Sequence, residues 1–194
     1  MHRKKRRLGN FLIVLGVLCL AGAMGLFLYN RAEDEKAGTA AGAVLSELKV
    51  ETASGDYVNP YDTAMTEVEI DGHLYIGYVR IPMLGLELPV MSEWSYPNLK
   101  ISPCRYTGSA KTNDLVICAH NYARHFGNIK NLSEGDDVYF TDMDGVTTHY
   151  NVAQVNILQP TAVSEMTDSG YALTLFTCTY GGRTRVTVRC VEAQ

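Results

Sequence analysis

Hydrophobic and polar positions divide the 194-residue chain into three stretches with different periods. Residues 8–30, LGNFLIVLGVLCLAGAMGLFLYN, contain no charged side chain and are mostly apolar for about six helical turns. A helix needs roughly 20 such residues to cross a hydrocarbon core of ~30 Å. The first pattern therefore predicts a transmembrane anchor over residues 8–30.

A cleaved signal peptide is the alternative for this segment. Ala21, Gly22 and Ala23 form a small-residue site of the kind that signal peptidase recognises. However, the apolar run continues past that site through Met24 to Tyr29, which a cleaved peptide does not require. We therefore favour an uncleaved anchor.

The second stretch, residues 31–66, has a helical period. Ala41, Val44, Leu45 and Leu48 follow the i, i+3, i+4, i+7 spacing of one apolar helix face. This spacing predicts a helical stalk over residues 31–56, which packs against the domain or the membrane surface. The turn-rich residues that follow predict a linker.

The third stretch, residues 67–194, has the alternation and turn signals of strands. Asp71-Gly72 and Asp144-Gly145 each separate two β-rich runs, as in hairpins. DLVICAH, residues 114–120, is apolar enough for a strand that is buried on both faces. The spacing of Phe126, Ile129 and Leu132 predicts one short helix. In all, about eight strands with one or two short helices indicate a mainly β fold, a closed or nearly closed β-barrel.

Charge orients the chain and excludes one class of partner. Residues 1–7 hold five of the 17 Lys and Arg, whereas residues from 31 onward hold twelve basic and all 21 acidic side chains. The basic segment is expected to stay cytoplasmic and the acidic domain to be extracellular. A balance of −9 over residues 31–194 argues against binding nucleic acid, which needs a basic face.

The exported part holds four cysteines, Cys104, Cys118, Cys178 and Cys190, while Cys19 lies in the anchor. An even number invites a disulfide interpretation, but the spacing matches no dense disulfide framework. Some of these thiols are therefore expected to be free. Cys178 and Cys190 fall on two strands that should be adjacent, so a thiol redox protein is one alternative, which a disulfide between them would support.

Cys178 has the setting of a nucleophile. It ends a strand, and Arg183, Arg185 and Arg189 follow within eleven residues. A nearby cation favours the thiolate, which is the reactive form of cysteine. A thiol nucleophile also needs a proton partner. His120 ends the buried strand 114–120 directly before a loop, where its imidazole would lie at the rim of a pocket.

Metal and serine chemistry have weaker support. His120 and His125 are five residues apart, and neither C-x-x-C nor H-x-x-x-H spacing supports a zinc site. His125 lies in a polar segment, for which we expect a surface position. No G-x-S-x-G motif is present.

These motifs together resemble the sortases, the membrane-anchored cysteine transpeptidases of Gram-positive bacteria. TLFTC at residues 174–178, followed by Arg185 before an apolar strand, is similar to the T-L-x-T-C strand and arginine of that family. ICAHN at 117–121 resembles the strand that carries the family histidine, and YVRIPMLGLELPV at 78–90 resembles an early strand pair. The resemblance covers roughly residues 70 to 191.

The resemblance implies a sortase-type β-barrel as catalytic domain over residues 67–194. Cys178 would attack the threonine carbonyl of an LPxTG-like sorting signal and form a thioacyl intermediate. His120 would protonate the leaving amine, and Arg185 would bind the substrate backbone and the oxyanion. The acceptor would be an amine of a peptidoglycan precursor or a pilin, with no cofactor and no metal.

Several details depart from the family pattern or stay open. Ala119 stands where glycine is frequent, and Arg183 competes with Arg185 for the arginine role. Arg189 would share the side of Arg185, and we favour a solvated position for it over a supporting role. Only Asn59-Pro60-Tyr61 resembles the lid motif of pilin-polymerising members, which favours a housekeeping or specialised anchoring role.

Two further predictions concern the surroundings of the site. Residues 159–171 should form one wall of a substrate groove. The acidic residues between Glu134 and Asp144 are explained by a solvated hairpin, so calcium is not predicted. A non-enzymatic extracellular β-barrel, acting as a binding or scaffold module with a degenerate site, remains the alternative to a transpeptidase.

Overall fold

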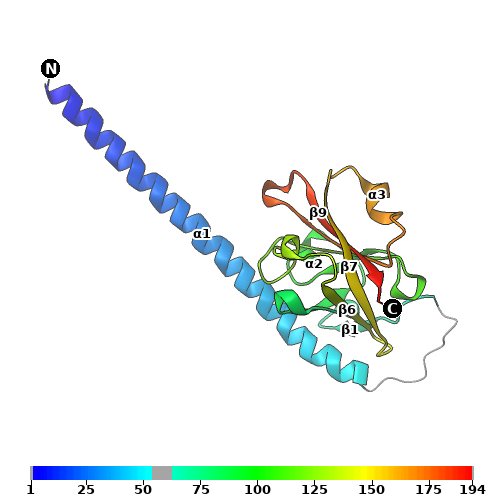
Figure 1. The fold of residues 1–194 in the computed structure, drawn as a ribbon. Coiled ribbons are helices and arrows are strands. Elements are labelled where there is room, and N and C mark those ends of the chain that lie inside the picture. The colour runs from blue at the N-terminus through cyan, green and yellow to red at the C-terminus, as the bar shows by residue number, and fades with distance from the viewer. Residues whose placement is uncertain (1, 54–62, 194) are drawn as a thin grey trace. The chain divides into compact units, whose positions relative to one another are not determined.

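A computed structural model describes residues 2–53 and 63–193 of the chain (Figure 1). Residues 1–36 and 37–194 form two compact units, which are described separately. The described residues of the first unit, 2–36, lie within helix α1 (His2–Ala53). By length and composition, α1 is the one helix among the described residues that is able to cross a membrane. It includes the anchor predicted over residues 8–30.

The second unit begins with the end of α1. Ala37, Ala41, Val44 and Leu48 are buried there, at the spacing of one helix face, and Leu45 is half-buried. The helix predicted over residues 31–56 is confirmed as far as Ala53. Most of the predicted linker, and with it Asn59-Pro60-Tyr61, lies outside the described residues.

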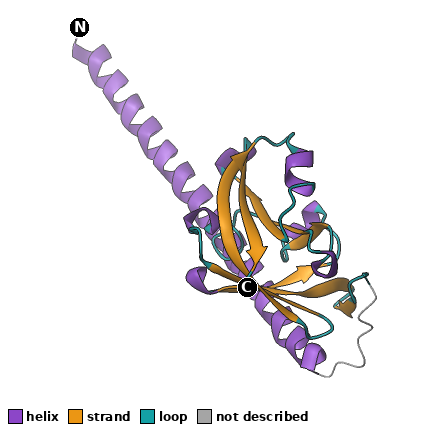
Figure 2. Cartoon of the chain, turned by 45° about the vertical axis from the view of Figure 1, so that its right-hand side comes forward, coloured by secondary structure: helices purple, strands orange, loops and turns teal. Residues whose placement is uncertain are grey.

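One sheet of nine strands forms the body of this unit within residues 63–193 (Figure 2). The strand order is β1-β2-β3-β4-β5-β8-β9-β7-β6, and pairing of β6 with β2 closes the ring. Because β1 extends the β2 edge that β6 also uses, eight strands make the barrel, as the sequence predicts. The strands are β1 (Val68–Ile70), β2 (His73–Ile81), β3 (Leu86–Met91), β4 (Cys104–Thr107), β5 (Leu115–Ala119), β6 (Asp137–Asp142), β7 (Thr147–Leu158), β8 (Leu173–Cys178) and β9 (Arg185–Glu192).

Short helices occupy the connections between the strands. They are α2 (Tyr96–Leu99), α3 (Val163–Thr167) and the 3-10 turns η1 (Pro82–Leu84), η2 (Ala110–Thr112), η3 (Ile129–Asn131) and η4 (Tyr180–Gly182). Both predicted hairpins are present, and Asp71, Gly72 and Gly145 have the positive φ that their turns require.

The short helix predicted from Phe126, Ile129 and Leu132 is confirmed only in part, as the single 3-10 turn η3. All three side chains are buried, so their spacing also reflects the side of the segment that faces the core. The backbone amides of Phe126 and Gly127 donate instead to the carbonyls of His120 and Tyr122, which closes a compact loop.

Two apolar clusters cover the two faces of the central strands. Alternate residues such as Ile117 of β5 and Leu175 of β8 fill the barrel interior. Cys118 points the other way, into a cluster that includes Val44 and Leu48 of α1 and Tyr75 of β2. Burial on both faces explains why the sequence of β5 is apolar without interruption.

Candidate active site

Strand register brings Cys178, His120 and Arg185 together. In the antiparallel β8–β9 ladder, Cys178 is directly opposite Arg185. In the parallel β5–β8 ladder, Ala119 is opposite Thr177, so His120 and Cys178 are the next residues of the two strands. Since alternate side chains leave opposite faces, this register directs Cys178 and Arg185 to the outer face of the barrel.

An apolar groove of about 190 Å³ lies on this face, and Cys178, His120 and Arg185 all line it. Its floor includes Cys118 and Phe176, the outward neighbours of the site on β5 and β8. One wall comes from residues 159–166, as the sequence predicts for 159–171. The wall residues are Gln159, Pro160, Ala162, Val163 and Met166.

Aromatic side chains also line the groove, and the sequence does not predict them. Trp94 contacts Tyr96 and Tyr106 with ring centroids 6.0 and 5.7 Å apart, and Tyr106 meets Phe176 edge to face at 5.3 Å. Trp94, Tyr96 and Tyr106 come from the β3–β4 connection and β4, and no motif marks them. The single tryptophan of the chain is the one sequence feature that distinguishes this segment.

The turn after β8 fixes the position of Cys178. The amide of Thr179 donates to the carbonyl of Thr184 at 3.0 Å, and the two threonine hydroxyls are 2.9 Å apart. Gly181 and Gly182 both have positive φ, which L side chains rarely adopt. The turn therefore begins directly after Cys178, the last residue of β8. The Cys178 thiol is half-exposed in the groove.

His120 is half-buried at the end of β5, with its ring centroid 4.8 Å from that of Tyr122. The hydroxyl of Thr177 donates to the carbonyl of Ala119 at 2.8 Å, which ties β5 to β8 directly beside the site. Burial, with a smaller contribution from the charge of Lys100, lowers the pKa of the His120 imidazole. The imidazole is therefore neutral at neutral pH and able to accept a proton.

Arg185, and not Arg183, lines the groove. Its Nη1 donates to the carbonyls of Gly182 and Thr184 at 3.0 and 3.1 Å, which holds the guanidinium at the mouth of the groove. Arg183 is exposed and is not among the lining residues. Of the two arginines that compete for this role, the geometry favours Arg185.

The solvated position predicted for Arg189 is wrong, because only 4% of this residue is exposed. Its Nη1 donates to the Thr174 hydroxyl at 2.9 Å and to the Met166 carbonyl at 3.2 Å, and its Nη2 donates to the Glu165 carbonyl. The residue lies beneath α3, which covers this part of β9. Arg189 therefore connects α3, which forms part of the groove wall, to β8 of the barrel by hydrogen bonds.

The surface position predicted for His125 is also wrong, since the residue is fully buried in the loop after β5. Its ring lies 5.5 Å from that of Tyr122. The polar residues around His125 suggest an exposed loop, but the loop folds back on itself and buries the imidazole.

Cys104, Cys118, Cys178 and Cys190 are all free thiols. Burial raises the pKa of Cys104 and of Cys190 to about 12 and also raises that of Cys118. Cys190 is opposite Leu173, at the far end of the ladder from Cys178, and belongs to the interior cluster. This register places the two thiols too far apart for a Cys178–Cys190 disulfide. It therefore argues against the alternative of a thiol redox protein that uses this pair.

The acidic residues near the β6–β7 turn already have protein partners. Asp144 lies 2.7 Å from the Lys111 ammonium and accepts a hydrogen bond from Thr66 at 2.5 Å. Asp142 accepts from the amides of Asp144 and Val146. In the part of the chain that the structure describes, no three His, Cys, Asp or Glu side chains gather as a metal site would require.

A sequence profile of the sortase domain matches residues 79–193. The chain is a member of the sortase family. Sortase membership supports a transpeptidase activity and accounts for the barrel topology. Proteins of curated function give no match to this sortase.

Solved structures of other sortases share the fold. Sortase C1 of Streptococcus suis is 29% identical over 62% of this chain and 73% of its own, with a TM-score of 0.53. Sortase C1 of Streptococcus agalactiae is 26% identical over 65% and 71%, with a TM-score of 0.56. A sortase D5 transpeptidase of Clostridium perfringens is 17% identical over 80% and 99%, with a TM-score of 0.61.

Proposed function

We propose that this sortase is a membrane-anchored cysteine transpeptidase that cleaves an LPxTG-like sorting signal and joins its acyl half to an amine. The observation that carries the proposal is the meeting of Cys178, His120 and Arg185 at one groove. Adjacent strands set their positions, so the three side chains are preorganised before any peptide binds.

In the first half-reaction, the Cys178 sulfur attacks the threonine carbonyl carbon while His120 accepts the thiol proton. The peptide C–N bond then breaks, and the imidazolium donates its proton to the leaving amine. Because burial lowers the pKa of His120, its protonated form is a stronger acid, which favours this donation. The product is a thioester between Cys178 and the acyl half of the peptide.

Arg185 stabilises the oxyanion that develops in this step. The carbonyls of Gly182 and Thr184 take up part of its hydrogen-bonding capacity and fix the guanidinium beside the groove. The remaining N–H groups are available for the oxyanion and the substrate backbone. Such preorganised donors commonly account for about 3 kcal/mol of transition-state stabilisation.

In the second half-reaction, an acceptor amine attacks the thioester carbon and gives its proton to His120. The Cys178 thiolate leaves and takes that proton back, which restores the free enzyme. The acceptor is an amine of a peptidoglycan precursor or of a pilin. The pilin option has support from structural neighbours described as pilus-related, including a sortase C of Group B Streptococcus.

The apolar helix supports an anchor over residues 8–30, with residues 1–7 in the cytoplasm and the catalytic domain, residues 67–194, outside. This topology places the groove where exported substrates and cell-wall amines are present. Residues 31–66 form the stalk and linker between anchor and domain.

Peptide transfer by the full-length chain in detergent micelles tests the proposal. LPxTG-like peptides, varied at each motif position, are incubated with and without triglycine as acceptor, and products are identified by mass spectrometry. We expect a triglycine adduct of the acyl half with wild type and none with Cys178→Ala. Absence of cleavage and transfer across the whole peptide set would contradict the proposal.

A further inference from the structure

The end of α1 packs directly on the loop that follows His120. A Cβ atom added to Gly38 would lie 2.1 Å from Cδ of Arg124, 3.1 Å from its Cβ and 3.2 Å from its Cγ. The neighbouring Ala37 and Ala41 are 2% and 1% exposed. Gly38 and the Arg124 side chain are therefore in close contact, and a side chain at position 38 would have to displace that of Arg124.

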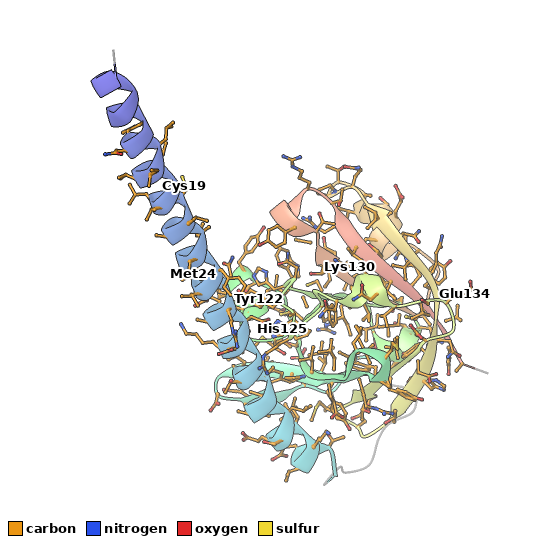
Figure 3. All side chains as sticks on the ribbon, turned by 60° about the vertical axis from the view of Figure 1, so that its left-hand side comes forward. Cys19, Met24, Tyr122, His125, Lys130 and Glu134 are labelled. Carbon is orange, nitrogen blue, oxygen red and sulfur yellow. The ribbon has the colours of Figure 1, made fainter. Side chains whose placement is uncertain are left out.

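The same loop is connected to His120 by hydrogen bonds and ring contacts. The amide of Phe126 donates to the His120 carbonyl at 3.2 Å, and that of Gly127 donates to the Tyr122 carbonyl at 2.8 Å. The centroid of the Tyr122 ring lies 4.8 Å from that of His120 and 5.5 Å from that of His125. Figure 3 labels Tyr122 and His125, two residues of this loop. A displacement of the loop would therefore move His120.

We propose that the end of α1, through the close contact at Gly38, is a positioning element for the catalytic imidazole of His120. This inference rests on the proposed function, because it assigns a catalytic role to His120. It extends the catalytic unit beyond the barrel: the helix that follows the anchor supports one of the reacting groups.

Gly38 is informative because its helix contains a matched glycine. Glycine in a helix interior costs about 1 kcal/mol relative to alanine, so a side chain at an open position should not harm the helix. Gly42 is such a position, since a Cβ there would meet nothing within 4 Å. Replacing either glycine by leucine makes the same chemical change in the same helix, but only Gly38→Leu displaces the Arg124 side chain and so pushes on the loop that carries it.

The test compares full-length wild type, Gly38→Leu and Gly42→Leu in detergent micelles, with Gly38→Ala as a milder variant. Amide hydrogen exchange of residues 120–127, followed by mass spectrometry, reports the loop without reference to activity. The rate of thioester formation, its KM for peptide and its dependence on pH report His120.

We expect faster exchange in residues 120–127 for Gly38→Leu and a rate of thioester formation at least about tenfold lower, because small misplacements of catalytic groups are costly. KM should stay within about twofold of wild type, because the groove walls come from other elements. Since burial lowers the pKa of His120, loosening the loop should also move the acid limb of the pH profile to higher pH. Gly42→Leu should match wild type in every readout.

The outcomes separate this inference from the proposed function. If wild type forms no thioester with any peptide, the proposed function fails and the positioning role fails with it. If wild type is active but the two leucine variants exchange and react alike, the inference alone is wrong. Faster exchange in Gly38→Leu with an unchanged rate and pH profile would also overturn it, because the contact would then be structural only.

Discussion

Cys178 and Arg185 are a directly opposed pair in the antiparallel ladder of β8 and β9. Side chains of such pairs leave the same face of the sheet, with Cβ atoms roughly 4.5–5.5 Å apart. The proposed nucleophile and the group that stabilises the oxyanion are therefore held together by backbone hydrogen bonds. No loop has to close to assemble this part of the site.

Replacing Arg185 by lysine tests this pair. Lysine keeps the charge but loses the planar fork, so it is unable to hold two carbonyls and bind the oxyanion together. We expect thioester formation to slow by about 100-fold, the cost of losing one such donor. The control is Arg183→Lys, which alters an exposed side chain outside the groove and should leave the rate unchanged. Equal losses in the two variants would contradict the assignment of Arg185.

Selective alkylation tests whether Cys178 is the accessible thiol. Cys104 and Cys190, with pKa values of about 12, hold about one part in ten thousand as thiolate at pH 8. In a Cys19→Ala background, iodoacetamide should modify the half-exposed Cys178 first and nearly alone, as peptide mapping would reveal. Equally slow reaction of all four thiols would favour a barrel with a degenerate, non-catalytic site.

Lys100 should tune the protonation of His120. Its positive charge contributes to the lowered pKa of the imidazole, so Lys100→Met should raise that pKa toward the ordinary value of about 6.5. Because thioester formation needs the neutral imidazole, the acid limb of the pH–rate profile should shift to higher pH. Lys130→Met, which removes an exposed charge elsewhere, is the control. An unchanged or downward-shifted limb for Lys100→Met would contradict this electrostatic role.

Arg189→Met should damage the groove wall more than the reacting groups. The change removes hydrogen bonds to the carbonyls of Glu165 and Met166 and leaves both without this partner, a loss of about 3 kcal/mol. We expect KM for peptide to rise about tenfold or more, discrimination among peptides to weaken, and the pH profile to stay as in wild type. Arg183→Met is the matched control on the solvent side. A variant that lowers kcat alone would indicate a role in the chemical step instead.

Leu48→Ala tests how far α1 belongs to the catalytic unit. Leu48 is fully buried in the cluster with Val44 and Tyr75, so truncation should lower the free energy of unfolding by about 3 kcal/mol. Val50, which is 69% exposed on the same helix, should tolerate alanine within about 0.5 kcal/mol. Chemical denaturation of the full chain in micelles measures both. Equal stability of the two variants would show that this packing contributes little.

Much of the fold, and the positions of several residues of the proposed site, can be predicted from local sequence patterns. Asp-Gly pairs between β-rich runs identify both hairpins, and an uninterrupted apolar run identifies β5. Cys178 and His120 stand where their strands end, which is visible in the sequence because turn residues follow. The groove wall at residues 159–171 is predictable for a similar reason, since no strand pattern fills that interval.

The remaining features depend on contacts between segments far apart in the chain. Arg189 has the sequence context of an exposed strand residue, and only the position of α3 above it makes it buried. His125 has polar neighbours, yet the loop folds it inward. The aromatic groove lining at Trp94 and the helix contact at Gly38 have no local signature, because each depends on the segment that packs against it.

Formation of a thioester on Cys178 is tested most simply by the intact mass of the full-length chain after brief reaction with LPxTG-like peptides, without an added amine. We expect a mass increase equal to the acyl half of one peptide. The adduct should be absent in Cys178→Ala and should be released when triglycine is added. An unchanged mass with every peptide, or the same adduct on Cys178→Ala, would contradict a thioacyl intermediate on Cys178.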